Sequence, residues 1–201
     1  MNKILPNLNI ENSYKNIISG YICGIDEVGR GCLAGPVVAA AIILDFKIIP
    51  KDINDSKKLS KIKRENLSEI LKDTAIDFAI GEASNKEIDN LNILKASLLA
   101  MKRAYEKLKV PSELALIDGP YSPNISCKTD NIIQGDTKSV SIAAASIIAK
   151  QSRDKIMEEI GLIYPKYNFK NNAGYGTKEH YKIIESNGIT SYHRKSFRLF
   201  K

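Results

Sequence analysis

Apolar and polar positions alternate in a way that predicts three strands in the first half of the chain. Tyr21–Asp26 is predicted as a strand that runs into a glycine-containing turn, and the continuously apolar Pro36–Leu44 as a strand buried on both faces. Apolar residues at every second position predict a third strand over Ala75–Ala83, with a basic helix over about Ser60–Lys72 before it. Since little chain separates these strands, we expect an antiparallel meander.

The apolar period lengthens to three or four residues after Ser84, which indicates a helix. The capping-box sequence Ser84-Asn-Lys-Glu87 begins this long helix, and Pro111 ends it. Leu114–Asp118 then predicts a short strand, which can lie parallel to the first because a helical crossover precedes it. Ile132 and Ile133 indicate a fifth strand.

Two more helices complete the predicted elements. One covers about Ser139–Ile160, where a run of small residues allows close approach to the sheet, and the last runs from its N-cap Thr177 to Gly188. The sequence contains no internal repeat, low-complexity segment or linker. We therefore expect one domain over residues 1–201, an α/β fold with a mixed five-stranded sheet flanked by helices and a C-terminal helical extension from about residue 160.

Composition narrows the class of protein. With 43% hydrophobic and 26% charged residues and a mean hydropathy of -0.21, the chain of 201 residues is typical of a soluble globular domain and not of a collagen-like, coiled-coil or disordered protein. No uncharged apolar run reaches the about 18 residues that a membrane span needs, and Met1–Gly20 lacks a signal-peptide pattern, so we expect a cytoplasmic protein. The three cysteines, Cys23, Cys32 and Cys127, have neither disulfide-framework nor zinc-site spacing.

The net charge of +7 is concentrated at the C-terminal end of the chain. Ile160–Lys201 holds eight Lys or Arg residues against two Glu. A basic extension of this kind suits a polyanion such as nucleic acid. A solvated lysine-rich face explains the same charge, and charge alone does not decide between the two.

Four acidic residues stand where predicted apolar elements end. Asp26 and Glu27 close the first strand, Asp118 closes the fourth, and Asp136 precedes the helix that begins near Ser139. If the first and fourth strands are parallel neighbours, Asp26 and Asp118 meet at the carboxyl edge of the sheet, where open α/β sheets hold their sites. Adjacent residues of a regular strand point to opposite faces, so Glu27 joins them only if the strand already bends into the turn.

Clustered carboxylates favour a bound cation. At a separation of about 4 Å each pair repels by about 1 to 4 kcal/mol, and a site of oxygen ligands prefers magnesium or manganese to zinc. Two such ions about 4 Å apart can activate a water and stabilise the leaving oxygen in phosphodiester hydrolysis. A turn or helix-cap role explains any one of these acids as well, and their spacing alone leaves the choice open.

Several sequence strings resemble the motifs of type 2 ribonucleases H, and within that family those of bacterial ribonuclease HII. They are Gly24-Ile-Asp-Glu-Val-Gly-Arg-Gly31 with Gly35-Pro36, Asp55-Ser-Lys-Lys-Leu-Ser60, Asp118-Gly119, the string from Gly135-Asp136 to Arg153-Asp154, Gly174-Tyr-Gly-Thr177 with His180, and His193-Arg-Lys-Ser-Phe197. Their span from residue 20 to 197 covers nearly the whole chain. The first and fourth strings are the most specific.

The resemblance implies a ribonuclease H-like fold and a metal-dependent endonuclease that uses Mn²⁺ or Mg²⁺. Such an enzyme cuts the RNA strand of RNA/DNA hybrids and single ribonucleotides embedded in duplex DNA, leaves 5′-phosphate ends, and supports removal of misincorporated ribonucleotides. Its partner is the hybrid or ribonucleotide-containing duplex, with no membrane, and we expect a monomer.

The resemblance also implies roles for individual residues. The catalytic and metal-binding carboxylates are Asp26, Glu27, Asp118 and Asp136. The substrate-binding residues are Gly29, Arg30 and Gly31 at the 2′-hydroxyl and phosphate, Tyr175 on the sugar at the RNA-to-DNA junction, and Lys57, Lys58 and Arg194 on phosphates. These roles agree with elementary chemistry, because the 2′-hydroxyl separates RNA from DNA and glycine lets a backbone approach a ligand closely.

Some residues keep two interpretations. His180 either packs or binds phosphate, and Phe197, Leu199 and Phe200 either pack or form a peptide for a protein partner. Pro120 stands where the family more often has a polar residue after Asp-Gly, which affects the path of the loop.

Other classes of protein share part of the pattern. A nucleic-acid binding module would share the basic extension but has no reason to gather acids against its own polyanion. A two-carboxylate glycoside hydrolase would use the acids without metal. A DNA nuclease or strand-transfer enzyme of the same fold would share the metal pair, but the ribose-sensing motif argues against it.

Overall fold

A single mixed sheet forms the centre of the molecule. In this computed structural model, which describes residues 5–54, 56 and 59–200, the sheet has five strands in the order β3-β2-β1-β4-β5. The strands are β1 (Tyr21–Val28), β2 (Val37–Ile43), β3 (Asp77–Ala83), β4 (Ser112–Asp118) and β5 (Lys128–Ile132). β1, β2 and β3 pair antiparallel, whereas β4 lies parallel to β1 and β5 parallel to β4. The predicted meander and the predicted parallel fourth strand are both confirmed.

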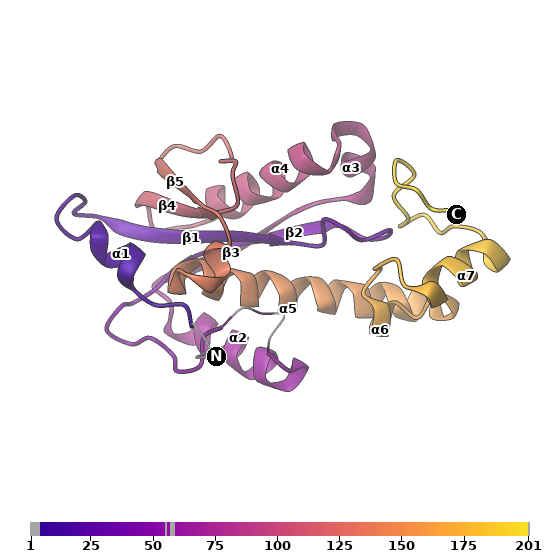
Figure 1. Cartoon of the computed structure of the whole chain (residues 1–201), viewed down its shortest axis with the longest axis horizontal. Helices are drawn as coiled ribbons and strands as arrows, with labels where there is room; N and C mark the ends of the chain where they lie inside the picture. Colours follow the sequence, from indigo (N-terminus) through magenta and orange to yellow (C-terminus); the bar gives the residue numbers. More distant parts are fainter. Residues whose placement is uncertain (1–4, 55, 57–58, 201) are drawn as a thin grey trace.

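Helices cover both faces of the sheet (Figure 1). α3 (Asn85–Leu91) and α4 (Ile93–Glu106) lie on one face. The long helix α5 (Val140–Ile163) runs along the other face, and α2 (Lys61–Thr74) packs against α5. The short helix α1 (Asn9–Ser13) lies at the start of α5, where the carboxylate of its Glu11 accepts the backbone N–H of Ser141 at 3.0 Å.

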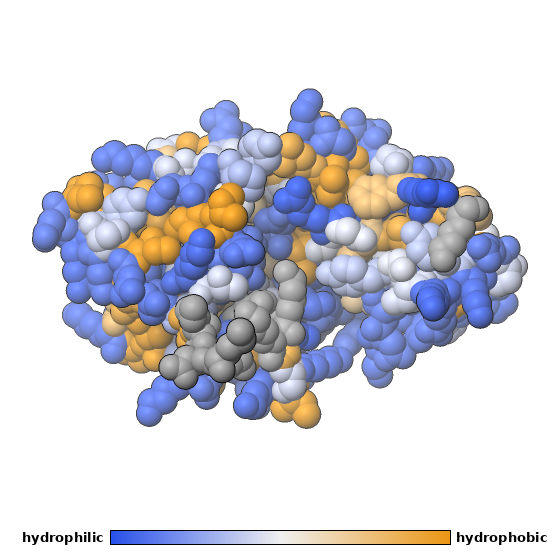
Figure 2. Space-filling view, viewed as in Figure 1, coloured by the Kyte–Doolittle hydropathy of each residue, from blue (hydrophilic) through white to orange (hydrophobic). Residues whose placement is uncertain are grey.

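The C-terminal extension packs around the C-terminal end of α5 (Figure 1). It contains the one-turn helix η2 (Pro165–Tyr167), α6 (Phe169–Asn172) and α7 (Lys178–Asn187). The Thr177 side chain accepts the N–H of His180, which confirms its predicted role as N-cap. The extension has an apolar core of its own with the end of α5, and its visible face is mostly hydrophilic (Figure 2).

The prediction of one continuous helix from Ser84 to Pro111 is wrong at Asn92. This residue adopts a φ of 73°, which ends α3 and starts α4. Its backbone N–H bonds to the carbonyl of Ile88 and its side chain accepts the N–H of Lys95. Asparagine tolerates the left-handed region because its short amide can bond locally, so one residue serves as the C-cap of α3 and the N-cap of α4.

The fifth strand begins before the predicted isoleucine pair. β5 is the mostly polar segment Lys128–Ile132, and Ile133 lies outside it with 55% of its surface exposed. An edge strand pairs on one side only and keeps one face in water, so hydrophobicity is a weak guide to its position.

α5 lies very close to the central strand β1. A Cβ atom at Gly24 would overlap with the backbone carbonyl of Ser141, so only glycine fits there. The run of small residues on α5, Ala143 to Ala145, is fully buried against the sheet. The predicted close approach of this helix is therefore confirmed.

Side chains of α4 and of its C-cap residue Lys107 reach the edge strand β3. The guanidinium of Arg103 donates to the carbonyl of Glu82 at 2.8 Å, and the ammonium of Lys107 donates to the carbonyl of Ile80 at 2.9 Å. β3 is the outermost strand on this side of the sheet, so these bonds tie α4 and the residue after it to the edge strand.

Two expectations from composition also have an outcome. Among the described residues, no helix is both long and apolar enough to cross a membrane. Cys23, Cys32 and Cys127 are all free thiols, and the first two are buried.

Gly24→Ala tests the packing of α5 on β1. We expect the free energy of unfolding to fall by about 1 to 3 kcal/mol, because the added methyl group must push the Ser141 backbone away. Chemical denaturation measures this change. Gly31→Ala is the matched control, since a Cβ there meets no atom within 4 Å; equal losses in the two variants would contradict the packing argument.

Candidate active site

Parallel pairing of β1 with β4 brings two of the predicted acids together. The register aligns Ile25 with Ile117, so Asp26 and Asp118 occupy the next positions on neighbouring strands. Asp26 is 5% exposed, and its Oδ1 accepts the N–H of Glu27 at 2.7 Å. Both carboxylates thus stand at the carboxyl edge of the sheet, as the sequence predicted.

A short helical turn carries Asp136 to the same edge. The turn η1 (Gly135–Thr137) precedes α5, and the N–H of Gly135 donates to Oδ1 of Asp118 at 2.6 Å. The Ser139 side chain then caps α5 by accepting the N–H of Ile142. This bond between Asp118 and Gly135 fixes the entry to the helix next to the end of β4.

Glu27 reaches the edge from the other face of the sheet. The bend that the sequence analysis made a condition for Glu27 to join the other acids does not occur, because β1 continues through Val28 and Glu27 still pairs with Ala39 of β2. Glu27 and Asp118 both border a small cleft beside α4, which Pro120 also lines. The acids therefore converge on the strand ends from both sides of the sheet.

The other three acids affect the ionisation of Asp26. Burial raises the pKa of Asp26 well above its usual range, and the negative charges of Glu27, Asp118 and Asp136 raise it further. A hydrogen bond from the Ser146 side chain on α5 acts in the opposite direction. Ionising Asp26 therefore costs free energy unless a positive charge is present.

Glu27 has a positive neighbour of its own. Burial raises its pKa, whereas the Arg30 guanidinium, which donates to Oε1 at 3.0 Å, lowers it. The second oxygen, Oε2, is buried and finds no hydrogen-bond partner in the part of the chain that the structure describes. An unpartnered buried carboxylate oxygen is costly, and a cation would satisfy it.

The donor set fits a hard divalent ion. All four side chains offer carboxylate oxygens, and Glu27 offers one that no other described residue binds. Among the described residues, no group of three acidic, histidine or cysteine side chains already encloses an ion position. To hold one ion together, the four side chains would therefore have to change their rotamers.

Two buried arginines hold the loop that follows β1. Arg153 of α5 donates to the carbonyls of Pro36, Ala34 and Ala173 at 2.9, 3.0 and 2.8 Å. Arg194 donates to those of Gly35, Arg30 and Pro36 at 3.0, 2.8 and 3.2 Å. Both side chains are 0% exposed.

The prediction that Arg194 contacts substrate phosphate is therefore wrong. Its guanidinium lies inside the protein and is committed to backbone carbonyls. Burial lowers the pKa of Arg194 to about 10, which still leaves the group charged at neutral pH. It acts on the Gly29–Gly31 loop from beneath, through the carbonyl of Arg30.

The loop glycines have distinct structural reasons. Gly29 adopts a φ of 95°, and a Cβ there would overlap with the Arg153 side chain. Gly31 has open space around it, which leaves its backbone accessible to a ligand. The Arg30 side chain is 47% exposed and points its guanidinium at Glu27. The loop thus presents backbone and one cation next to the acids.

Tyr175 lies beside this loop. It forms an antiparallel bridge with Cys32, and 37% of its surface is exposed. Lys150 Nζ and Arg153 Cζ each lie 5.9 Å from the centre of its ring. Burial raises the pKa of Tyr175 to about 12, so its hydroxyl stays protonated.

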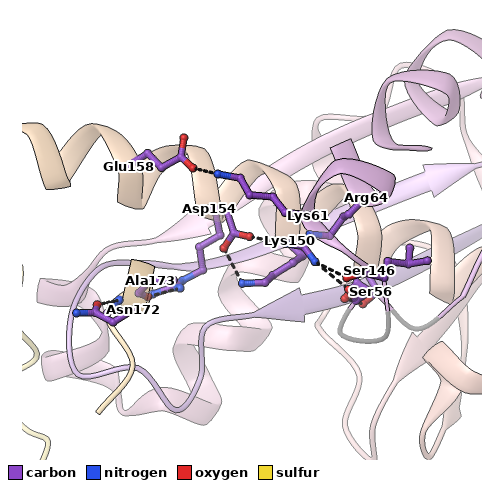
Figure 3. A network of polar contacts seen from close by, with 12 residues as sticks. Ser56, Lys61, Arg64, Ser146, Lys150, Asp154, Glu158, Asn172 and Ala173 are labelled. Carbon is purple, nitrogen blue, oxygen red and sulfur yellow. Dashed lines mark hydrogen bonds and ion pairs between the residues drawn. The ribbon is translucent and has the colours of Figure 1, made fainter. Parts of the chain in front are cut away.

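A polar network on α5 and α2 extends the site away from the acids (Figure 3). Asp154 accepts from Lys150 at 2.6 Å and from Arg64 at 3.1 Å, and Lys61 pairs with Glu158. These residues border a polar hollow of about 180 Å³. Ser56 and Ser146 share a hydrogen bond of 2.9 Å, and Ser146 also connects this network to Asp26.

Lys57 and Lys58, which the sequence assigned to phosphate contacts, lie outside the described residues. Their neighbour Ser56 is described, and its carbonyl accepts from Arg64 at 3.0 Å.

Sequence reasoning missed Arg153, although a signal was present. Arg153 stands four residues from both Ala149 and Met157, on the stripe of α5 that faces the interior. An arginine at a core-facing helix position must find buried acceptors, which marks it as a structural cation.

The structure decides between two interpretations for residues of the extension. His180 is 0% exposed, so its packing interpretation is right and its phosphate interpretation is wrong. Leu199 is 5% exposed and packs in the core of the extension with Phe197, whereas Phe200 is 56% exposed.

Comparison with known proteins points to one family. Residues 23–200 match the family model described as Ribonuclease HII. Ribonuclease HII of Pelagibacter ubique is 54% identical over 177 residues, which is 88% of this chain and 95% of that protein. A chain of the PCNA:RNase HII complex from Archaeoglobus fulgidus has a TM-score of 0.75 and 26% identity, covering 90% of this chain and 96% of its own. Bst-RNase HIII in complex with Mn²⁺ shares the fold, with a TM-score of 0.75 and 21% identity over 90% of this chain and 68% of its own.

Asp26, Glu27, Asp118 and Asp136 at the carboxyl edge of the sheet are called the acid edge below. Asp26→Asn tests the electrostatic cost of gathering these acids. Because the folded protein raises the pKa of Asp26, the charged form destabilises the fold at neutral pH. We expect the variant to be more stable than the wild type at pH 7 with a chelator, because the neutral amide avoids the cost of a buried negative charge.

The sign of the pH dependence follows. The stability that wild-type Asp26 contributes at low pH is lost as the pH rises through its raised pKa, so the gap between variant and wild type should narrow on acidification. Thermal melting across pH measures this gap. Asp73→Asn on the exposed face of α2 is the matched control; a gap that widens at low pH would contradict the prediction.

Proposed function

The chain belongs to the ribonuclease HII family, and from this membership together with the acid edge we propose which residues cut the substrate and which recognise it. The protein is a ribonuclease H, an endonuclease that hydrolyses the RNA strand of RNA/DNA hybrids. Excision of ribonucleotides from duplex DNA is the role of this family. The glycoside hydrolase, the binding module and the DNA-directed nuclease are thereby excluded.

One observation carries the proposal for catalysis. Asp26 is a nearly fully buried carboxylate whose ionisation three neighbouring acids oppose. Such a cluster stays charged only beside a positive ion, and the family depends on a divalent metal. We assign Asp26, Glu27, Asp118 and Asp136 as the ligands of that metal and Mg²⁺ or Mn²⁺ as the ion; Mn²⁺ is the ion in the Bst-RNase HIII complex.

When bound, the metal supplies Lewis-acid activation of a water and stabilisation of the leaving oxygen. The protein residues orient the acids and tune their charge. The Ser146 hydroxyl favours the charged form of Asp26, and the Gly135 N–H orients Asp118. Arg30, which faces Glu27 across 3.0 Å, brings a positive charge to the place where a substrate phosphate would approach.

The loop and the tyrosine supply recognition. We assign the backbone of Gly29 and Gly31 and the Arg30 side chain to the 2′-hydroxyl and phosphate of the ribonucleotide, because glycine allows close approach and the loop is held from beneath. The half-buried ring of Tyr175 presents its exposed part next to Cys32 and is suited to pack on the sugar at the junction.

Other predictions about the protein stay open to experiment. The phosphate contacts of Lys57 and Lys58, the monomeric state and the cytoplasmic location stay predictions. The relative from Archaeoglobus fulgidus was solved with PCNA, a binding property of that protein. For this chain we propose the RNA/DNA hybrid and ribonucleotide-containing duplex as the partners of the acid edge.

Asp26→Asn also tests catalysis. We expect at least about a 100-fold lower cleavage rate on a duplex with one ribonucleotide, equivalent to about 2.7 kcal/mol of transition-state stabilisation, with hybrid binding largely retained. The assay compares Mg²⁺, Mn²⁺ and a chelator and identifies the product ends as 5′-phosphate. Asp73→Asn should cleave like the wild type; full turnover by Asp26→Asn, or by the wild type in chelator, would refute the assignment.

Tyr175→Ala tests the junction role. Removal of the ring should lower cleavage at a single embedded ribonucleotide about ten-fold more than cleavage within a long RNA stretch, because only the first substrate depends on the sugar next to the junction. Tyr175→Phe keeps the ring and should behave like the wild type. An equal loss by Tyr175→Ala on both substrates would count against the role.

A further inference from the structure

Two histidines of the extension lie in direct contact behind the substrate loop. His180 belongs to α7 and His193 to the segment after it, and their exposed fractions are 0% and 1%. Their Nε2 atoms lie 3.1 Å apart. The rings of Tyr167 and Phe169 surround the pair. The catalytic assignments above use neither imidazole.

The hydrogen bonds of the pair run in one direction. The backbone N–H of Thr190 can only donate, and it points at Nδ1 of His193 at 2.9 Å. This nitrogen therefore carries no proton, and a neutral His193 holds its hydrogen on Nε2. Nε2 of His180 must then accept it, which leaves the hydrogen of His180 on Nδ1. That N–H donates to the carbonyl of Tyr175 at 2.8 Å.

The chain of bonds requires both rings to be neutral. An extra proton on His180 would set two N–H groups against each other across 3.1 Å, and one on His193 would remove the acceptor of Thr190. Burial lowers the pKa of both rings, that of His193 to about 4. The order of hydrogens is therefore fixed at neutral pH.

The chain of hydrogen bonds from Thr190 through His193 and His180, called the relay below, ends on Tyr175, the residue assigned to the RNA-to-DNA junction. The carbonyl of Tyr175 accepts from His180 and from the N–H of Thr177, while its own N–H bonds to Asn172. At the other end, His193 bridges to Ala34 of the loop after β1, and the next residue, Arg194, holds the carbonyl of Arg30. One segment therefore supports Tyr175 and the glycine loop together.

We propose that His180 and His193 are positioning residues for ribose recognition, which fix the backbone of Tyr175 relative to the Gly29–Gly31 loop through a directed pair of neutral imidazoles. The proposal rests on the junction role of Tyr175. It adds that the ability to distinguish an embedded ribonucleotide depends on a hydrogen donated at Nδ1 of His180, and not only on the volume of the ring.

Two substitutions of His180 separate the effect of the hydrogen donated at Nδ1 from the effect of the volume of the ring. In His180→Asn the amide occupies the place of Nδ1 and can donate to Tyr175, whereas in His180→Gln it reaches toward the place of Nε2. The readout is the ratio of cleavage at a single ribonucleotide to cleavage in a long hybrid, measured in one sample so that the folded fraction cancels. We expect His180→Gln to lower this ratio about five-fold, mainly through KM, and His180→Asn to keep it.

The outcomes separate the relay from the junction role. If Tyr175→Ala leaves the ratio unchanged, the junction role fails and the relay proposal fails with it. If Tyr175→Ala lowers the ratio but both His180 variants keep it, or both lower it equally, only the relay is overturned.

The wild-type protein offers an independent check. ¹⁵N imidazole resonances at pH 7 should show the Nδ1–H tautomer for His180 and the Nε2–H tautomer for His193. The reverse assignment, or a charged ring, would overturn the proposal without any substitution.

Discussion

Two guanidinium groups, for which the described residues provide no carboxylate partner, hold the active-site loop in place. Arg153 and Arg194 are fully buried, and each donates three hydrogen bonds to main-chain carbonyls around the loop that follows β1. A buried cation costs several kcal/mol unless it is well bonded. Moving the carbonyls would break its hydrogen bonds, so the guanidinium groups hold these carbonyls in place. The glycine loop, the end of α5 and the C-terminal extension are thereby fixed as one unit.

The acid edge shows the opposite balance. Around Gly24 the helix α5 packs on β1 without space for a methyl group, yet two residues later Asp26 carries a carboxyl group whose charge its surroundings oppose. The tight packing at Gly24 stabilises this part of β1, but burial there destabilises the charged form of Asp26. A stable fold that holds a destabilised charged group is typical of functional sites. Binding of the ligand then offsets the free energy that the charged group costs.

Sequence patterns predicted what depends on periodicity and order. Pairing of β1 with β4, and hence the meeting of Asp26 with Asp118, followed from one helical crossover. The break at Asn92 was missed because an apolar stripe continues through it, and the φ of 73° depends on one residue. The burial of Arg194 was missed because a charged side chain in a basic segment looks solvated until its acceptors are known.

The free edge of β3 has a consequence for the molecule in a crowded solution. Sheets that end in bare carbonyl and N–H groups offer a template on which another chain can add a strand. Here Arg103 of α4 and Lys107 just after it donate to the carbonyls of Glu82 and Ile80. A strand from another molecule would first have to displace these two side chains. They therefore hinder intermolecular β-pairing at the edge of β3 and the fibrils that can grow from it.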